Sequence, residues 1–599
     1  MTQDSPRAFY IARIKSLEDE LRILNRKKAI LAWSRLFSFL AAVTALWLLI
    51  PQGWLIAVPT TIVLLSVFIF FVFKDVSNSS LIENNIHLRK INQNEIAALD
   101  HNYMEFPDGL ECKPAAHSYA DDLDIFGRAS LYQYINRTTS QQGNRLFANW
   151  LLFPAQPAEI VQRQQAVKEL ATFPEWRQQL QALGQKKILT AQTQEKIGEW
   201  LAEAIQFSTK KSWKMVRIIF PIIGFTIFGL YITGLIPQRT FLPLTLLLLI
   251  ISQLISRQIM PAYARLNKVV GELETFSASI GWIEKASFQS PLLIEIKRSF
   301  DKDGDTASQT INHLKKILAR LDYRLNPLVY IPISAFLCWD LLQAFSLEKW
   351  KTKNHATIPG WFSSLAQTEA LASLANLVFN HPGWCFPDLV AERSVFNADT
   401  LGHPLIPPGK RVDNSFSTSG EGQVNLITGS NMAGKSTFLR SVGINMVLAM
   451  CGAPVCAKQL SVSHMKVMSS MRISDNLEES TSTFYAELKK LKEIIEAVTR
   501  KEEVFLLLDE ILRGTNSADR HTGSTALLKQ LIRLNASGLV ATHDLELAKL
   551  SNQFPQNIHN YHFDVQVATD ELYFDYKLKE GVCQSMNASI LMKKIGIEL

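Results

Sequence analysis

The stretch VNLITGSNMAGKST, from Val424 to Thr437, decides the fold of the region around it. The short apolar run 424–428 predicts a buried strand, and Gly429 opens the turn that follows. Gly434-Lys435-Ser436 then leads into a segment with helical periodicity. This spacing, between a strand and a helix, is that of a phosphate-binding loop. The backbone N–H groups of such a loop point at phosphate oxygens, and the N-terminus of the helix faces the same anion.

The residues of this loop have individual expected roles. Lys435 should reach the β- and γ-phosphates of a nucleotide, and the Ser436 hydroxyl should ligate Mg²⁺. A chance glycine-rich turn is the alternative, which the flanking strand and helix disfavour. The candidate nucleotide-binding residues of the loop are Gly429, Ser430, Asn431, Met432, Ala433, Gly434, Lys435, Ser436 and Thr437.

Two further apolar runs end in residues that can act on phosphates. Residues 504–508 predict a strand that ends in Asp509 and Glu510, an aspartate able to hold Mg²⁺ and a glutamate able to activate water. Residues 538–541 predict another strand, and His543 follows it. An ordinary solvated strand end is the alternative for the two carboxylates. Together with the loop, these residues predict a nucleotide-hydrolysing site in an α/β domain.

Four segments, in order, resemble the ATPase domain of MutS, the DNA mismatch-repair family. They are GSNMAGKST (429–437), STFYAEL (482–488), DEILRGT (509–515) and ATHDLEL (541–547). The resemblance implies a C-terminal P-loop ATPase domain of the ABC type that uses ATP and Mg²⁺. It also implies a homodimer in which each nucleotide site is closed by the partner.

The resemblance also implies roles for single residues. Asn431 would touch the γ-phosphate, Ser482 would reach the partner's nucleotide, and His543 would sense the γ-phosphate. Tyr576 falls where the family places a ring against adenine. The resulting catalytic candidates are Glu510, His543 and Lys435, and the metal candidates are Ser436 and Asp509.

The sequence departs from the family pattern at a few positions. Ala433 and Leu512 stand where the family usually has glycines, and residues 585–587 read Ser-Met-Asn in place of Ser-Tyr-Gly. These changes remove no catalytic group. They bear on how nucleotide state is coupled to the rest of the molecule.

Two apolar stretches predict transmembrane hairpins. Residues 36–73 contain no charged residue and divide at Pro51-Gln52-Gly53. A second stretch, 218–255, divides at a turn expected over 237–240. Each half approaches the roughly 20 apolar residues that cross a bilayer, the first with Arg35 reaching the interface. A buried soluble hairpin is the alternative, which the lack of a polar face disfavours.

Basic residues flank both stretches and are nearly missing from their turns, where Arg239 is the one example. This asymmetry predicts a multi-pass protein of the inner cell membrane with its ATPase domain in the cytoplasm. The N-terminal residues do not have the pattern of a cleavable signal peptide. The flanking basic residues are Arg26, Lys27, Lys28, Arg35, Lys74, Lys210, Lys211, Lys214, Arg217, Arg257 and Arg265.

Part of the remaining sequence resembles the helical core of MutS. Residues 122–170 have apolar residues at helical intervals and a WLL-x-P segment, 361–379 look like the return helix of that core, and LGHPLI (401–406) resembles the motif before the nucleotide domain. The mismatch-reading wedge, phenylalanine-x-glutamate, has only a poor counterpart in Phe106-Pro107-Asp108. The resemblance therefore covers about 122–599, interrupted by the second hairpin and without the mismatch-reading domain.

The expected organisation is multidomain: two transmembrane α-helical hairpins, an all-α core and an α/β P-loop domain. The expected boundaries are an N-terminal helix at 1–30, hairpins at 31–74 and 216–256, a linker at 75–118, a core at 119–215 and 257–390, and the ATPase domain at 391–599. The 599 residues carry a net charge of +7, and the six cysteines lack CxxC pairs and predict reduced thiols.

Three functions are compatible with these features. The first is a membrane-anchored ATPase that binds duplex DNA and works with other repair proteins, as the resemblance implies. The second is a membrane-tethered clamp or scaffold for a protein partner. The third is a transporter ATPase, which is disfavoured because the Leu-Ser-Gly-Gly signature is missing and no intramembrane charge marks a substrate path.

Overall fold

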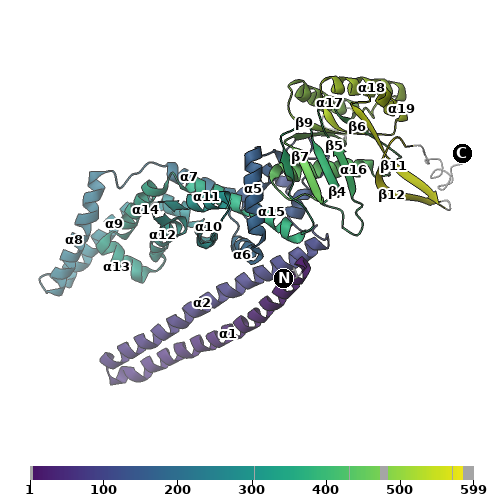
Figure 1. Ribbon diagram of the computed structural model, residues 1–599. Coiled ribbons are helices and arrows are strands. Elements are labelled where there is room, and N and C mark those ends of the chain that lie inside the picture. Colours follow the sequence, from purple (N-terminus) through teal and green to yellow (C-terminus); the bar gives the residue numbers. More distant parts are fainter. Residues whose placement is uncertain (1–4, 303, 431, 473–482, 569–570, 584–599) are drawn as a thin grey trace.

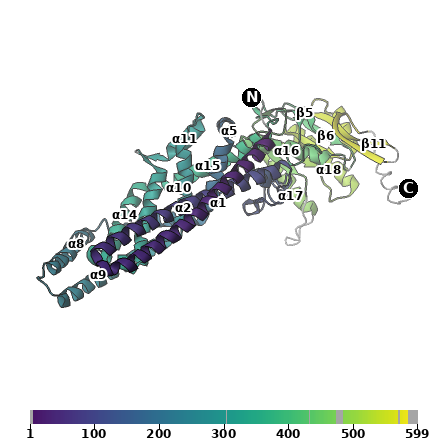
Figure 2. The same ribbon diagram turned by 90° about the horizontal axis from the view of Figure 1, so that it is seen from below.

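The computed structural model describes residues 5–302, 304–430, 432–472, 483–568 and 571–583. It has a long N-terminal helical hairpin, a helical body with a second hairpin, and a C-terminal α/β domain (Figure 1). Both views place the turns of the two hairpins at the end of the molecule away from the α/β domain (Figure 2). The two apolar hairpins therefore extend toward the same side.

The first hairpin consists of α1 (Pro6–Leu49) and α2 (Trp54–Leu99). A short 3₁₀ turn, Ile50–Gln52, and Gly53 at φ 111° join them, where the sequence predicts the break. The two helices do not stop at the expected boundaries at 30 and 74, and most of the expected linker is helix. The prediction of a linker at 75–118 is therefore wrong as far as Leu99.

Polar residues on the inner face of α2 explain this error. Buried positions recur at intervals of three and four, the spacing of a coiled-coil seam, but many of them are polar. Asn78 donates to the carbonyl of Leu24 at 3.0 Å, and Asn85 donates to Glu20 at 3.0 Å. An apolar-periodicity argument does not detect a seam made of asparagines.

The helical body is built around the central helix α15 (Ile358–Asn380), which covers the predicted return helix and packs against α4, α5, α6 and α11. A two-residue strand pair, β1 (Asp301–Lys302) and β2 (Asp305–Thr306), precedes α12. The other helices of the body are α3 (Leu131–Ile135), α4 (Gln141–Leu152), α5 (Pro157–Ala171), α6 (Pro174–Lys186), α7 (Ala191–Ala202), α10 (Val270–Lys285), α11 (Pro291–Ser299), α12 (Ala307–Leu321), α13 (Pro327–Leu337) and α14 (Trp339–Asn354).

The second hairpin consists of α8 (Lys211–Ile232) and α9 (Gln238–Asn267). Its turn lies at 233–237, because Gly234 adopts φ 74° and Pro237 caps the start of α9. The prediction of a turn at 237–240 is wrong by about four residues. By length and composition, four helices of the described chain can cross a membrane: α1, α2, α8 and α9.

The α/β domain contains a six-stranded sheet of order β12-β11-β6-β10-β9-β8, parallel except for the β11–β12 pair. A four-stranded sheet of order β3-β7-β4-β5 lies beside it. β3 pairs with β7, so the domain includes residues before the expected boundary at 391. The strands are β3 (Asp388–Val390), β4 (Phe396–Leu401), β5 (Asn414–Thr418), β6 (Val424–Thr428), β7 (Gln459–Ser463), β8 (Lys466–Ser470), β9 (Val504–Asp509), β10 (Ser537–Thr542), β11 (Ile558–Ala568) and β12 (Glu571–Glu580).

Helices cover both faces of the six-stranded sheet, with α16 (Lys435–Cys451) on one side and α17 (Thr483–Thr499), α18 (Ser517–Arg533) and the short α19 (Leu545–Ala548) on the other (Figure 1). α16 is buried along most of its length, in the same apolar core as the helical body. A Cβ on Gly443 of α16 would lie 2.7 Å from Leu123 of the body. The helix that follows the glycine loop is thus packed directly against the helical body.

Candidate functional site

The phosphate-binding loop lies where the sequence predicts it, between β6 and α16. Gly429 has φ 147°, and a Cβ there would lie 2.8 Å from the carbonyl oxygen of Phe563. Gly434 has φ 108° and directly precedes the helix. Both positions favour glycine, because other residues are strained at such φ values, and Gly429 also lacks space for a Cβ. The loop places its backbone at the N-terminus of α16, where an anion is favoured.

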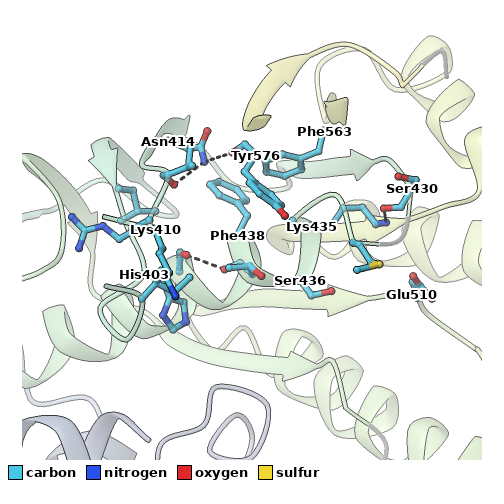
Figure 3. Close-up of a pocket in the computed structure, with 18 residues that line it drawn as sticks. His403, Lys410, Asn414, Ser430, Lys435, Ser436, Phe438, Glu510, Phe563 and Tyr576 are labelled. Atoms are coloured by element: carbon cyan, nitrogen blue, oxygen red, sulfur yellow. Dashed lines mark hydrogen bonds between the residues drawn. The ribbon is translucent and has the colours of Figure 1, made fainter. Parts of the chain in front are cut away.

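Lys435 lies inside the loop. Its ammonium group donates to the carbonyl oxygen of Gly429 at 2.7 Å. It also donates to that of Ser430 at 2.9 Å (Figure 3). The side chain is buried, and this burial lowers the pKa of Lys435. These two carbonyl bonds hold the charge at the concave side of the loop, where phosphate oxygens can replace them.

Asp509 and Ser436 meet at the ends of β9 and of the loop. Burial raises the pKa of Asp509, and the nearby Ser436 side chain partly offsets this effect. The Oδ1 atom of Asp509 is buried and has no hydrogen-bond partner. An orphaned carboxylate oxygen beside an exposed hydroxyl fits a divalent cation, which would satisfy both groups.

The residues present thus fit Mg²⁺ as the sequence predicts. Within the described residues, no group of three or more His, Cys, Asp or Glu side chains could hold a metal by itself. Mg²⁺ commonly takes one or two protein ligands and completes its shell with phosphate oxygens and water. Ser436 and Asp509 suit such a shared site.

Glu510 lies between a cation and an imidazole. Its Oε2 is 3.1 Å from Nε of Arg513 and 3.7 Å from Nδ1 of His543. Its backbone N–H donates to the carbonyl of Ala541 at 2.8 Å, and its φ of 50° turns the chain out of the sheet. The structure therefore brings Glu510 and His543 together as predicted. Arg513, quoted in the sequence motif without a role of its own, directly contacts the carboxylate.

The segments STFYAEL and DEILRGT contact each other within the chain. Glu487, which is buried on α17, accepts a hydrogen bond from the backbone N–H of Leu512 at 2.5 Å. A Cβ on Gly514 would lie 2.6 Å from the Cβ of Phe484, so glycine allows the two segments to approach. The contact between α17 and the segment that follows β9 is therefore direct.

The surroundings of Leu512 bear on its departure from the family pattern, which usually has glycine at this position. It has φ 61°, a conformation that favours glycine, yet its side chain is buried. The side chain packs over Gly523 of α18, where an added Cβ would lie 2.5 Å from Leu512. At Leu512, a strained backbone conformation thus occurs together with apolar packing of the side chain against α18.

A cavity of about 520 Å³ opens beside the loop (Figure 3). Tyr576 lines it with 43% of its surface exposed, and the carbonyl of Tyr576 accepts a hydrogen bond from Asn414 at 3.0 Å. The predicted site residues along its wall are Ser430, Met432, Gly434, Lys435, Ser436, Thr437, Glu510 and Tyr576. Gly429 and the buried Ala433 and Asp509 complete the loop region behind this wall.

Several residues of the cavity were not identified as site residues from the sequence. His403, Lys410, Asn414, Phe438 and Phe563 line it, distributed over a loop, a strand, α16 and β11. The resemblance of LGHPLI to a motif before the nucleotide domain was the available signal for His403. Burial lowers the pKa of His403 to about 4, and its Nδ1 accepts from the N–H of Leu405 at 3.2 Å. This imidazole is therefore neutral near pH 7.

Other predicted site residues, Asn431 and Ser482, lie outside the described part of the chain, as do residues 585–587. The approach to Ser482 is described as far as Arg472. There the buried Asp122 accepts from the N–H of Arg472 at 2.9 Å and from the hydroxyl of Ser469 at 2.7 Å. Asp122, from the helical body, thus holds the chain just before the segment that contains Ser482.

The parallel sheet, the glycine loop and the Ser436–Asp509–Glu510 arrangement define a P-loop nucleoside triphosphatase fold. Residues 425–595 match MutS domain V, and residues 117–220 match MutS domain III. Two parts of the chain thus match domains of the MutS family, and MutS domain V is an ATPase domain.

Relatives of known identity match over part of the chain. The DNA mismatch repair protein MutS of Clostridium kluyveri is 30% identical over 263 residues, which are 42% of this chain and 29% of that protein. MutS of Aquifex pyrophilus is 28% identical over 320 residues, 53% of this chain and 35% of that protein. DNA mismatch repair protein MSH3 of Phaeosphaeria nodorum is 32% identical over 229 residues, 37% and 20% of the two chains. The chain thus spans about a third or less of these relatives.

Proposed function

We propose that this protein is a membrane-anchored MutS-like ATPase whose nucleotide state controls contacts between two copies of the chain. The orphaned Oδ1 of Asp509 beside Ser436 carries the ATPase part of the proposal. Lys435 binds the β- and γ-phosphates, Ser436 and Asp509 hold Mg²⁺, and Glu510 positions and deprotonates water. Mg²⁺, when bound, neutralises charge on the phosphates.

The remaining site residues have proposed roles in binding and sensing. Tyr576 packs against the adenine ring, and His543 senses the γ-phosphate through its contact with Glu510. Ser482 reaches the nucleotide of the partner, so ATP draws two copies together. Asp122 supports this step, because it fixes the chain shortly before Ser482.

Membrane anchoring is supported by the exposed apolar halves of the two hairpins. In the first hairpin, Arg35 pairs with Asp75 at 2.5 Å. This ion pair lies between the apolar half of the hairpin, near its turn, and the half that contains the buried asparagines. The basic flanks support an orientation with the ATPase domain in the cytoplasm and both turns outside. A cysteine in place of Gln52 should then react with an impermeant thiol reagent from outside intact cells, and failure to react would refute this orientation.

Duplex DNA and other repair proteins are the partners that the relatives suggest, and we propose backbone-dominated DNA binding without mismatch preference. A protein partner held by a membrane-tethered clamp is the second candidate. One observation favours it: Phe106, the nearest counterpart of a mismatch wedge, packs in the body with Arg137 4.9 Å from its ring centre. Such a ring is not available to stack on a base.

Competition between matched and mismatched duplexes for the solubilised protein, at several salt concentrations, separates these candidates. For about six neutralised phosphates, affinity should fall roughly a thousandfold between ~50 and ~200 mM salt. A mismatch preference above about tenfold that persists as salt is raised would contradict the proposal, because direct readout of one base pair is worth roughly 1–3 kcal/mol. No binding to either duplex, with ATP hydrolysis intact, would favour the clamp.

A further inference from the structure

The segment around α13 has a strongly apolar surface outside the two hairpins. Leu325 is 78% exposed, Leu328 87% and Ile331 49%. Leu325 ends the short 3₁₀ turn Asp322–Leu325 before α13, whereas Leu328 and Ile331 lie on α13 itself, an eleven-residue helix that contains no charged residue. Such a patch on the surface of a folded chain marks an interaction site.

The opposite face of α13 packs against the second hairpin. A Cβ on Gly224 of α8 would lie 2.8 Å from the carbonyl oxygen of Phe336, so the two helices are in close contact. The ring of Phe336 lies 5.5 Å from that of Phe228, and Ser334 shares a hydrogen bond of 2.9 Å with Ser252 of α9. α13 therefore packs against both helices of the second hairpin and forms a three-helix unit with them.

These contacts fix how deep α13 lies along the hairpin. Arg217 and Arg257 mark the cytoplasmic ends of its apolar stretches. Gly224 is seven residues beyond Arg217, about 10 Å along the helix, and Ser252 is five residues from Arg257, about 7 Å. A bilayer that surrounds the hairpin therefore also surrounds the helix packed at that depth.

The length of α13 excludes a crossing. Eleven residues extend about 16 Å, roughly half of a hydrocarbon core of about 30 Å. At Cys338 the chain bends by 79° into α14, which carries charged residues and packs in the helical body. The chain thus enters the apolar layer and returns on the same side.

Polar and aromatic groups contact one another where the chain enters and leaves α13. The buried Asp340 accepts a hydrogen bond from Tyr330 at 2.8 Å and pairs with Arg324 at 3.4 Å. Trp339 stacks on Tyr323 and donates to the carbonyl of Arg320 at 2.8 Å. Aromatic rings with a polar end beside arginines are typical of a membrane–water boundary.

We propose that α13 is a re-entrant element that dips into the cytoplasmic leaflet beside the second hairpin, with Leu328 and Ile331 against lipid acyl chains. The inference rests on the proposed membrane anchoring. The lipid bilayer is the occupant because α13 packs against α8 and α9, and the outward side chains of all three helices are apolar and exposed. Four crossing helices and one half-inserted helix then hold the chain in the membrane.

Depth-dependent quenching tests this inference on the full chain in vesicles of phosphatidylcholine and phosphatidylglycerol. An environment-sensitive fluorophore is attached to one introduced cysteine, L328C, V63C or I188C; serine replaces the half-buried Cys112 and Cys385, and the buried native cysteines are retained. Val63 is 62% exposed in the middle of the α2 span, and Ile188 is 55% exposed in the helical body. Quenching is compared between lipids brominated near the headgroup and lipids brominated near the chain end.

The labels at Leu328 and Val63 should emit at shorter wavelength and lose intensity in brominated lipid, whereas the label at Ile188 should do neither. Bromines near the headgroup should quench Leu328 more than those near the chain end, with the reverse order at Val63. Quenching at Val63 but not at Leu328 would overturn the re-entrant helix and leave the anchoring intact. A blue-shifted, unquenched Leu328 would mean that protein covers it, and no quenching at either position would refute the anchoring and the inference together.

Discussion

The buried ion pair between Glu95 and Arg137 should determine how firmly the first hairpin is joined to the helical body. Glu95, near the end of α2, contacts Nε of Arg137 at 2.5 Å, and the two side chains are 3% and 10% exposed. Glu95 also accepts hydrogen bonds from Asn376 at 2.8 Å and Asn380 at 2.9 Å on α15. The substitution E95Q keeps the size of the side chain and removes its charge.

The cost of this substitution follows from the burial of its partner. Breaking a buried pair leaves a desolvated guanidinium and costs about 3–5 kcal/mol, a large part of the stability of a typical domain. For a unit of about 200 residues this corresponds to a fall in melting temperature on the order of 10 °C. Melting is followed by intrinsic fluorescence of the detergent-solubilised protein, with limited trypsin cleavage reporting release of the hairpin.

A nearby pair provides the control. Arg7 of α1 pairs at 2.6 Å with Asp100, the residue directly after α2, but both are about half exposed, so D100N should leave the melting temperature nearly unchanged. The double variant E95Q/R137M should melt above E95Q, because it removes the unpaired charge. Equal melting of E95Q and the unaltered protein would refute the assignment of this pair as the junction.

Two further predictions concern the nucleotide domain and acid stability. G514A should lower ATP turnover while nucleotide binding persists, because the new methyl group would lie 2.6 Å from the Cβ of Phe484; unchanged turnover would show that this contact is not needed. Burial lowers the pKa of His381 to about 4, below the ordinary value near 6.5, so the unfolded chain takes up the proton first as pH falls. Stability should therefore be lost from pH 6.5 toward pH 4, and H381F, measured by the same melting assay, should lose less; an equal loss would contradict this cause.

The nucleotide domain was the part best predicted from sequence. Its strand at 424–428 agrees with β6, and the strands expected at 504–508 and 538–541 agree with β9 and β10 to within a residue at either end. These strands are short apolar runs that end in glycine, carboxylate or histidine, so composition and motif point to the same boundaries. Free thiols were also confirmed, for Cys112, Cys338, Cys385, Cys451 and Cys456.

The helical parts were less predictable, because their contacts join residues far apart in sequence. Asn78, Asn85 and Asn92 are polar, and only a partner helix 50 or more residues away makes them a buried seam. The short α13 lacks the length of a span, so its sequence alone does not distinguish it from a core helix. The cavity beside the loop also unites His403, Phe563 and Tyr576 through the sheet rather than through a motif.

ATP turnover by the full chain in lipid vesicles tests the central claim most directly. K435A should abolish nucleotide binding, because the loop loses its cation. E510Q should bind ATP and hydrolyse it about 10²- to 10⁴-fold more slowly, as expected on removal of a general base. E503Q, at an exposed carboxylate just before β9, serves as the matched control and should turn over ATP normally. Equal turnover by E510Q and the unaltered protein, or turnover that survives K435A, would contradict the account.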